Sequence, residues 1–188
     1  MGSGTTLVEA KLLNRNAVGI DINPQSVSIS ETNLQFQCKT NSKIFIKNGN
    51  ASNMDFMKDE SIDFICTHPP YANVIEYSDG IDGDLSLMDV EAFINEIRRV
   101  ASESFRVLKN NRYCSIMIGD IRKNGNVIPL GFKMMECFLE CGFINKEIII
   151  KEQHNCKMTD YWEKKSRNFL LLEHEYIFVF QKKKRDAL

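Results

Sequence analysis

The chain has 188 residues, which is enough for one domain with a substantial hydrophobic core. Its 24 basic and 25 acidic residues give a formal net charge of −1, so a surface that binds nucleic acid must be a local patch. The six cysteines lack CxxC spacing, which predicts a reduced protein with no disulfide framework. No apolar stretch could span a membrane, and residues 1–15 lack the layout of a signal peptide. We therefore expect a cytoplasmic protein with no membrane association.

Helical and extended patterns alternate along the chain. In chain order they predict a helix at 5–14, a strand at 17–22, a helix at 23–37, strands at 43–48 and 61–67, a helix at 88–108, a strand at 113–120, a helix opened by Pro129 and ended by Gly142, and strands at 144–151 and 174–182. Asn23 is the expected cap of the second helix, with Pro24 as its first residue. Strands separated by helices predict the α/β class, with a doubly wound, mostly parallel sheet and helices on both faces. We expect one domain over 1–182 and a basic tail at 183–188.

The ends of the predicted strands locate a candidate site. In open α/β sheets, ligands bind beyond the carboxyl ends of the strands. The segments expected there are 1–6, 21–23, 48–51, 67–77 and 119–122. Glycine, acidic, amide and aromatic residues gather in these segments, so we expect the functional residues among them.

The first of these segments is glycine-rich and reads MGSGTT. Gly2 and Gly4 allow a tight turn and the close approach of a ligand to the backbone, and the following helix offers free amide groups. A GxG pattern alone is weak, and at a chain terminus it could also be leftover vector sequence.

An acidic residue, Asp21, lies at the end of the strand predicted at 17–22. Its distance in sequence from the glycine-rich turn is the one expected in a βαβ unit. A carboxylate in this place can accept hydrogen bonds from both hydroxyls of a ribose. The alternative is an exposed acid that caps the helix beginning at Pro24, and both roles are compatible.

Two consecutive prolines follow the apolar strand in the stretch CTHPPYANVIEYSDG, residues 66–80. They fix two backbone angles and remove two amide donors. The carbonyl of Pro69 is thereby held where it can accept a hydrogen bond from an exocyclic amine, and Tyr71 can stack on the base that carries that amine. The alternative is a stiff strand-to-loop turn in which Tyr71 caps the core.

Together these motifs resemble the S-adenosylmethionine-dependent amino-methyltransferases of DNA, which make N6-methyladenine or N4-methylcytosine. The resemblance runs from MGSGTTLVEA (1–10) and GIDINP (19–24) through THPPYANVIEYS (67–78) and RVLKNNRYCSIMIGD (106–120) to NFLLLEHEYIFVFQK (168–182). It implies a Rossmann-like fold, S-adenosyl-L-methionine as cofactor and double-stranded DNA with a flipped base as partner. It also implies roles for Gly2, Gly4 and Thr5 at the methionine part of the cofactor, Asp21 at the ribose, Asn50 and Ala51 near the adenine, and His68, Pro69, Pro70 and Tyr71 in catalysis.

The resemblance is incomplete at two places. His68 stands where the family usually has Asp, Asn or Ser; we expect a neutral imidazole that accepts a hydrogen bond, the alternative being a histidine that packs at the strand end. The chain also starts inside the cofactor motif, so we expect the first strand of the sheet to be missing and its neighbours to be unpaired. A misassigned start, a truncated gene, or a strand supplied by an upstream segment or a second chain would each explain this, and we expect weak cofactor binding by the chain as given.

The irregular stretch 152–168 is the candidate surface for nucleic acid. Basic and aromatic residues interleave there, which suits phosphate contact and base stacking, although a solvated loop is an equal alternative. The candidate contacts are Tyr161, Trp162, Lys164, Lys165 and Arg167, with Lys157 beside them. His154 and Cys156 lack further ligands at zinc-site spacing, so no metal is assigned.

From the sequence we therefore expect an enzyme that methylates an exocyclic amine of a DNA base, with adenine N6 preferred. Two alternatives stay open. One is an RNA base N-methyltransferase that uses the same motifs, and the other is a non-catalytic remnant or subunit with the methyltransferase fold.

Overall fold

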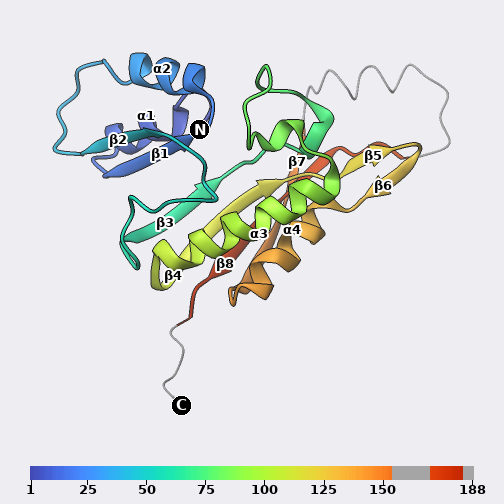
Figure 1. Ribbon diagram of the computed structural model, residues 1–188. Coiled ribbons are helices and arrows are strands. Elements are labelled where there is room, and N and C mark those ends of the chain that lie inside the picture. The colour runs from blue at the N-terminus through green and yellow to red at the C-terminus, as the bar shows by residue number, and fades with distance from the viewer. Residues whose placement is uncertain (154–169, 184–188) are drawn as a thin grey trace.

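The structure is a computed structural model that describes residues 1–153 and 170–183 (Figure 1). A two-stranded sheet, β1–β2, and a four-stranded sheet in the order β3–β4–β8–β7 carry the fold, and β5–β6 is a separate hairpin. The elements are α1 (Thr5–Leu12), β1 (Ala17–Asp21), α2 (Pro24–Asn33), β2 (Ile44–Asn48), β3 (Ile62–Thr67), two short 3-10 turns (Ala72–Val74 and Leu85–Leu87), α3 (Val90–Val107), β4 (Leu108–Ile118), β5 (Ile121–Lys123), β6 (Asn126–Ile128), α4 (Leu130–Glu140), β7 (Ile144–Glu152) and β8 (His174–Gln181).

Side-chain caps stabilise the starts of α2 and α3. The side chain of Asn23 accepts a hydrogen bond from the Gln25 amide, with Pro24 at the first position of α2. Asp89 caps α3 in the same way, by accepting from the Ala92 amide. Each cap satisfies an amide that the first turn of a helix leaves without a partner. The second helix ends at Asn33, several residues before the expected end.

The strand directions combine two patterns. β1 pairs with β2, and β3 with β4, in parallel register. β8 lies between β4 and β7 and is antiparallel to both. The expected parallel pairs are therefore present, and the four-stranded sheet also has an antiparallel side, which β8 forms with both of its neighbours.

A break divides the sheet between β1 and β3. In the part of the chain that the structure describes, β1 pairs with β2 alone and β3 with β4 alone. Figure 1 shows the β1–β2 unit separated from the four-stranded sheet, and β3 is the edge of that sheet on the side of the β1–β2 unit. Val18 on β1 is 40% exposed and Phe64 on β3 is 57% exposed. Both facing edges thus have unpaired backbone groups and exposed apolar side chains, at the place where the sequence leads us to expect a further strand.

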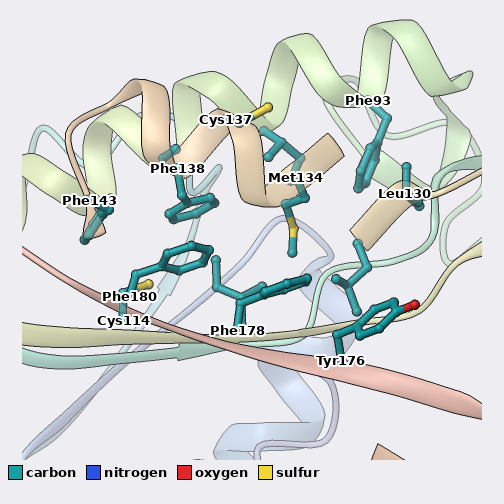
Figure 2. Close-up of a cluster of buried hydrophobic side chains, with 14 of the residues drawn as sticks. Phe93, Cys114, Leu130, Met134, Cys137, Phe138, Phe143, Tyr176, Phe178 and Phe180 are labelled. Carbon is teal, nitrogen blue, oxygen red and sulfur yellow. The ribbon is translucent and has the colours of Figure 1, made fainter. Parts of the chain in front are cut away.

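The core lies between α3, α4 and one face of the four-stranded sheet (Figure 2). Phe93 and Ile97 of α3 are buried there, and Phe138 of α4 stacks on Phe180 of β8 with ring centroids 5.0 Å apart. Burial of rings on this scale supplies much of the driving force for folding. No helix in the described ranges is long and apolar enough to cross a membrane, and the cysteines described there are all free.

Candidate active site

The glycine-rich turn leads directly into α1. Gly4 has φ +79°, and its carbonyl accepts hydrogen bonds from the amides of Leu7 and Val8 at 2.9 and 3.0 Å. A Cβ on Gly4 would lie 2.7 Å from Oγ of Ser30, which is fully buried on α2. Gly2 has φ +57° but open space around it, and its carbonyl accepts from the Ser30 hydroxyl at 3.1 Å. Gly4 therefore permits close packing of α1 on α2, while the space beside Gly2 is free for a ligand.

Asp21 holds this turn against the carboxyl end of β1. Its Oδ2 accepts from the Gly2 amide at 3.1 Å and lies 2.8 Å from the Met1 amino group, and its Oδ1 accepts from the Asn23 amide at 2.9 Å. The cap of α2 is Asn23, not Asp21, so the alternative interpretation of Asp21 as the helix cap is wrong. The carboxylate instead joins the glycine-rich turn to the end of the strand, and its role toward a ribose stays a prediction.

Asn50 supports the turn after β2. Its Oδ1 accepts from the Ser52 amide at 2.9 Å, and its Nδ2 donates to Glu96 of α3 at 3.2 Å. A Cβ on Gly83, which has φ +82°, would lie 2.9 Å from the same Nδ2. The side chain is thus occupied within the protein, and the expected contact of Asn50 and Ala51 with the cofactor adenine stays a prediction.

The two prolines follow the end of β3, and the chain then turns so that Tyr71 packs beside the sheet. Ala72, the next residue, is fully buried with φ +48°, so the chain turns sharply there. The ring of Tyr71 packs on Gly119, where a Cβ would lie 3.1 Å from its Cε2. Its hydroxyl lies 2.9 Å from Nε2 of His68 and donates to Glu175. Tyr71 is therefore anchored both by ring packing and by its hydroxyl; it packs against the core, as the alternative interpretation expected, and its stacking on a target base stays a prediction.

The sequence analysis did not single out Glu175 and Lys151, which the structure brings to the candidate site beside Tyr71 and His68. Glu175 lies near the start of β8, is 5% exposed, and pairs with the ammonium group of Lys151 on β7. The signal in the sequence is a charged residue at the head of the otherwise apolar run HEYIFVF. A buried carboxylate needs such partners, because burial of an unpaired charge is costly.

The charges of this cluster follow from its burial and partners. Burial lowers the pKa of His68; Glu175 opposes this shift, while Lys151 and the amino terminus add to it. Burial and the hydrogen bond to Glu175 raise the pKa of Tyr71 above its ordinary range. Burial alone would raise the pKa of Glu175, but the hydrogen bonds from Lys151 and Tyr71 lower it on balance. At neutral pH the cluster therefore contains a neutral imidazole, a neutral phenol and an ionised carboxylate.

The structure links the two expected parts of the site. Nδ2 of Asn23 donates to the carbonyl of Tyr77 at 2.9 Å, which ties the end of β1 to the segment after Tyr71. The Met1 amino group contacts Asp21, and its positive charge also lowers the pKa of His68. Among the described residues, no group of three or more His, Cys, Asp or Glu side chains could hold a metal ion. The expected nucleic-acid contacts lie outside the described residues: Tyr161, Trp162, Lys164, Lys165 and Arg167.

This fold, with polar and aromatic residues gathered at its strand ends, is that of a Rossmann-like methyltransferase. A SAM-dependent methyltransferase from Methanosarcina mazei superimposes with a TM-score of 0.66 over 97% of this chain and 89% of that chain, at 18% identity. A family model described as DNA methylase matches residues 1–32 and 62–187, and the chain belongs to that family.

Two further similarities are to a type II methyltransferase and to a protein solved with the cofactor. The type II methyltransferase M.MthZI of Methanothermobacter thermautotrophicus is 27% identical over 164 residues, which cover 77% of this chain and 45% of that protein. The present chain thus spans less than half of that relative. A Thermus thermophilus protein, solved in complex with S-adenosyl-L-methionine, has a TM-score of 0.54 at 26% identity over 74% of this chain and 56% of that chain.

The two glycines of the turn should differ in their tolerance of a side chain. Gly2→Ala adds a left-handed alanine in open space, at a backbone cost of about 1–2 kcal/mol. Gly4→Ala adds the same cost and a clash with Ser30, so it should lower the free energy of unfolding by at least about 1 kcal/mol more. Urea denaturation of both variants measures this difference, and equal losses would contradict the packing role of Gly4.

Proposed function

We propose that this chain is the methyl-transfer domain of a DNA methylase, and that it transfers a methyl group from S-adenosyl-L-methionine to an exocyclic amine of a DNA base, with adenine N6 preferred. The observation that supports this most is the Asn23–Tyr77 hydrogen bond, which joins the turn that holds Asp21 to the segment that continues from THPPY. One segment has the features of a cofactor site and the other those of a base site, and methyl transfer requires both to be adjacent.

The residues of the glycine-rich turn fit the cofactor. The space beside Gly2 is open, and the Asp21 carboxylate can accept hydrogen bonds from ribose hydroxyls. When bound, S-adenosyl-L-methionine supplies the electrophilic methyl group of its sulfonium. The similar T. thermophilus structure holds this molecule, which supports the same assignment here. We assign Gly2, Gly4 and Thr5 to its methionine part and Asp21 to its ribose, with Asn50 and Ala51 near its adenine.

The THPPY segment holds the target base. The Pro69 carbonyl and a neutral His68 accept hydrogen bonds from the exocyclic amine, which fixes its nitrogen for in-line attack. Tyr71 stacks on the base after it leaves the duplex, and Pro70 keeps the segment rigid. As the amine nitrogen forms the new N–C bond, the bond between the methyl carbon and the sulfonium sulfur would break and S-adenosyl-L-homocysteine would leave; the nitrogen then loses one proton to solvent. The side chains contribute orientation more than acid–base strength.

The break in the sheet supports a second part of the proposal. The exposed edges of β1 and β3 suit one further parallel strand between them. Since Met1 lies at the carboxyl end of β1, an apolar segment joined ahead of Met1 would run parallel to β1 and end at the cofactor turn. We assign the strand to such a segment, with a second chain as the alternative source. The same break also favours the rival function, a non-catalytic subunit or remnant that does not bind the cofactor.

The products of methyl transfer test the proposed function directly. The protein, with a radiolabelled methyl donor, should label unmethylated duplex DNA and leave transfer RNA unlabelled, because the THPPY segment is proposed to hold a DNA base. Nucleoside analysis should identify N6-methyladenine. Recovery of N4-methylcytosine would correct the base, label in transfer RNA would support the RNA alternative, and no label in either would favour the remnant.

A strand added ahead of Met1 should strengthen cofactor binding. We expect the extended protein to bind S-adenosyl-L-methionine at least about tenfold tighter than the 188-residue chain, a difference of about 1.4 kcal/mol, because the paired edges hold the glycine-rich turn in place. Calorimetric titration of both forms measures this, with a scrambled polar extension of equal length as control. Equal affinity of the two extended forms would count against the added strand.

The pH dependence tests the role of His68. A neutral imidazole accepts from the amine and a protonated one does not, so the rate should fall as the pH drops through the pKa of His68. Because burial lowers that pKa, the fall should begin at more acidic pH than for an ordinary histidine. His68→Ala should lose this limb and about 100-fold in kcat, while Asp63→Asn, at an exposed carboxylate paired with Lys109, should keep the whole profile. Full activity of His68→Ala would refute the role.

A further inference from the structure

Glu175 occupies a position that packing alone does not explain. Its carboxylate is buried near the start of β8 and has partners from several other parts of the chain, among them the side chain of Gln153. Tyr71 donates to one oxygen, Lys151 of β7 pairs with the other, and Nε2 of His68 lies 3.6 Å from the first. The carboxylate therefore contacts both residues that flank the two prolines.

The hydrogen bonds in this cluster determine which nitrogen of His68 carries the proton. An ionised Glu175 can only accept, so the single proton of the Tyr71 hydroxyl is committed to it. The hydroxyl oxygen, 2.9 Å from Nε2 of His68, must then accept from Nε2–H. A neutral imidazole with its proton on Nε2 has its lone pair on Nδ1.

We propose that Glu175 is a positioning residue that acts through the Tyr71 hydroxyl to hold His68 as the Nε2–H tautomer, so that Nδ1 is the acceptor for the target amine. The role of Nδ1 rests on the proposed methyl transfer, whereas the control of the tautomer does not. His68 is 47% exposed, so the imidazole can present Nδ1 to a ligand while Nε2 stays bound. Without the carboxylate, Tyr71 could donate to Nε2 instead, and the acceptor would be lost from Nδ1.

The charges around His68 make the proposal measurable. The charged groups that face it are Glu175 of β8, Lys151 of β7 and the amino group of Met1, with Tyr71 as the neighbouring titratable group. Glu175→Gln removes a negative charge and should lower the pKa of His68. Lys151→Met removes a positive charge and should raise the pKa. If the two substitutions only loosened the structure, both would raise the pKa of His68 toward its ordinary value, because the lowering by burial would then be lost.

A second cluster of the same kind serves as an internal control. Nε2 of His174 lies 3.0 Å from the Tyr176 hydroxyl, which donates to Asp120 at 3.3 Å. The chain has three histidines, so the ring signals of each can be assigned with single substitutions such as His68→Gln. Substitution of Glu175 or Tyr71 should change the tautomer of His68 and leave the tautomer of His174 unchanged.

The experiment is nitrogen-15 NMR of histidine-labelled protein, titrated over pH. The wild type should show His68 with its proton on Nε2. Tyr71→Phe and Glu175→Gln should each raise the Nδ1–H population severalfold, and the pKa should shift in opposite directions in Glu175→Gln and Lys151→Met. A His68 tautomer unchanged in both Tyr71→Phe and Glu175→Gln, or pKa shifts of one sign in the two charge variants, would overturn the proposal.

Methyl transfer supplies the second readout. Glu175→Gln should lower kcat by about 10- to 100-fold with a smaller change in KM, since a misplaced acceptor impairs the reaction more than binding. A changed tautomer with full kcat would show that Glu175 does not position the reaction. If the wild type keeps the Nε2–H tautomer but transfers no methyl group, the proposed function fails and the control of the tautomer stands.

Discussion

The antiparallel pairing of β8 with β4 is the constraint on which the site depends. In this register Ile118 lies opposite Tyr176, so the end of β4 and the start of β8 meet at one edge. Gly119, which follows β4, and Glu175, which precedes Tyr176 on β8, are thereby brought to the same place. The stacking of α4 on β8, through Phe138 and Phe180, holds this register from the other end of the strand. The core thus determines where Tyr71 finds its partners.

Anchoring of Tyr71 has a consequence for base recognition. A ring that is held at one edge by the Gly119 backbone and at its hydroxyl by Glu175 has little rotational freedom left to lose on binding. Stacking on such a ring therefore costs less conformational entropy than stacking on a mobile one. The same contacts explain why a tyrosine suits this position, because phenylalanine would leave the buried carboxylate without one of its donors.

Local patterns predicted most of the elements, and the hairpin that was missed also had a local signal. The 3.6-residue period predicted α3, and Asn23 with Pro24 predicted the start of α2, because these signals act within one or two turns. The hairpin β5–β6 had a local signal that was overlooked: Asn124 and Gly125, with φ +52° and +80°, form an Asn-Gly turn.

The site was predictable to the extent that its residues follow strand ends. Asp21 and the His68–Tyr71 segment were assigned to the candidate site in this way, and their roles in it stay predictions. Lys151 and Glu175 were not, since their contacts depend on the register of two strands far from the motif in sequence. The break between β1 and β3 was expected from the resemblance to the family alone, because the sequences of the described strands do not themselves indicate that a strand between them is absent.

The amino terminus connects the break in the sheet with the chemistry of the site. In this chain the Met1 ammonium group lies 2.8 Å from Asp21 and lowers the pKa of His68. A strand joined ahead of Met1 would replace that ammonium by a neutral amide. The change would pair the open edges of β1 and β3, and it would also free one oxygen of Asp21 from a charged partner that would compete with the ribose hydroxyls proposed to bind there. Loss of the positive charge would in turn raise the pKa of His68, so strand pairing, cofactor affinity and the acidic limit of activity should change together.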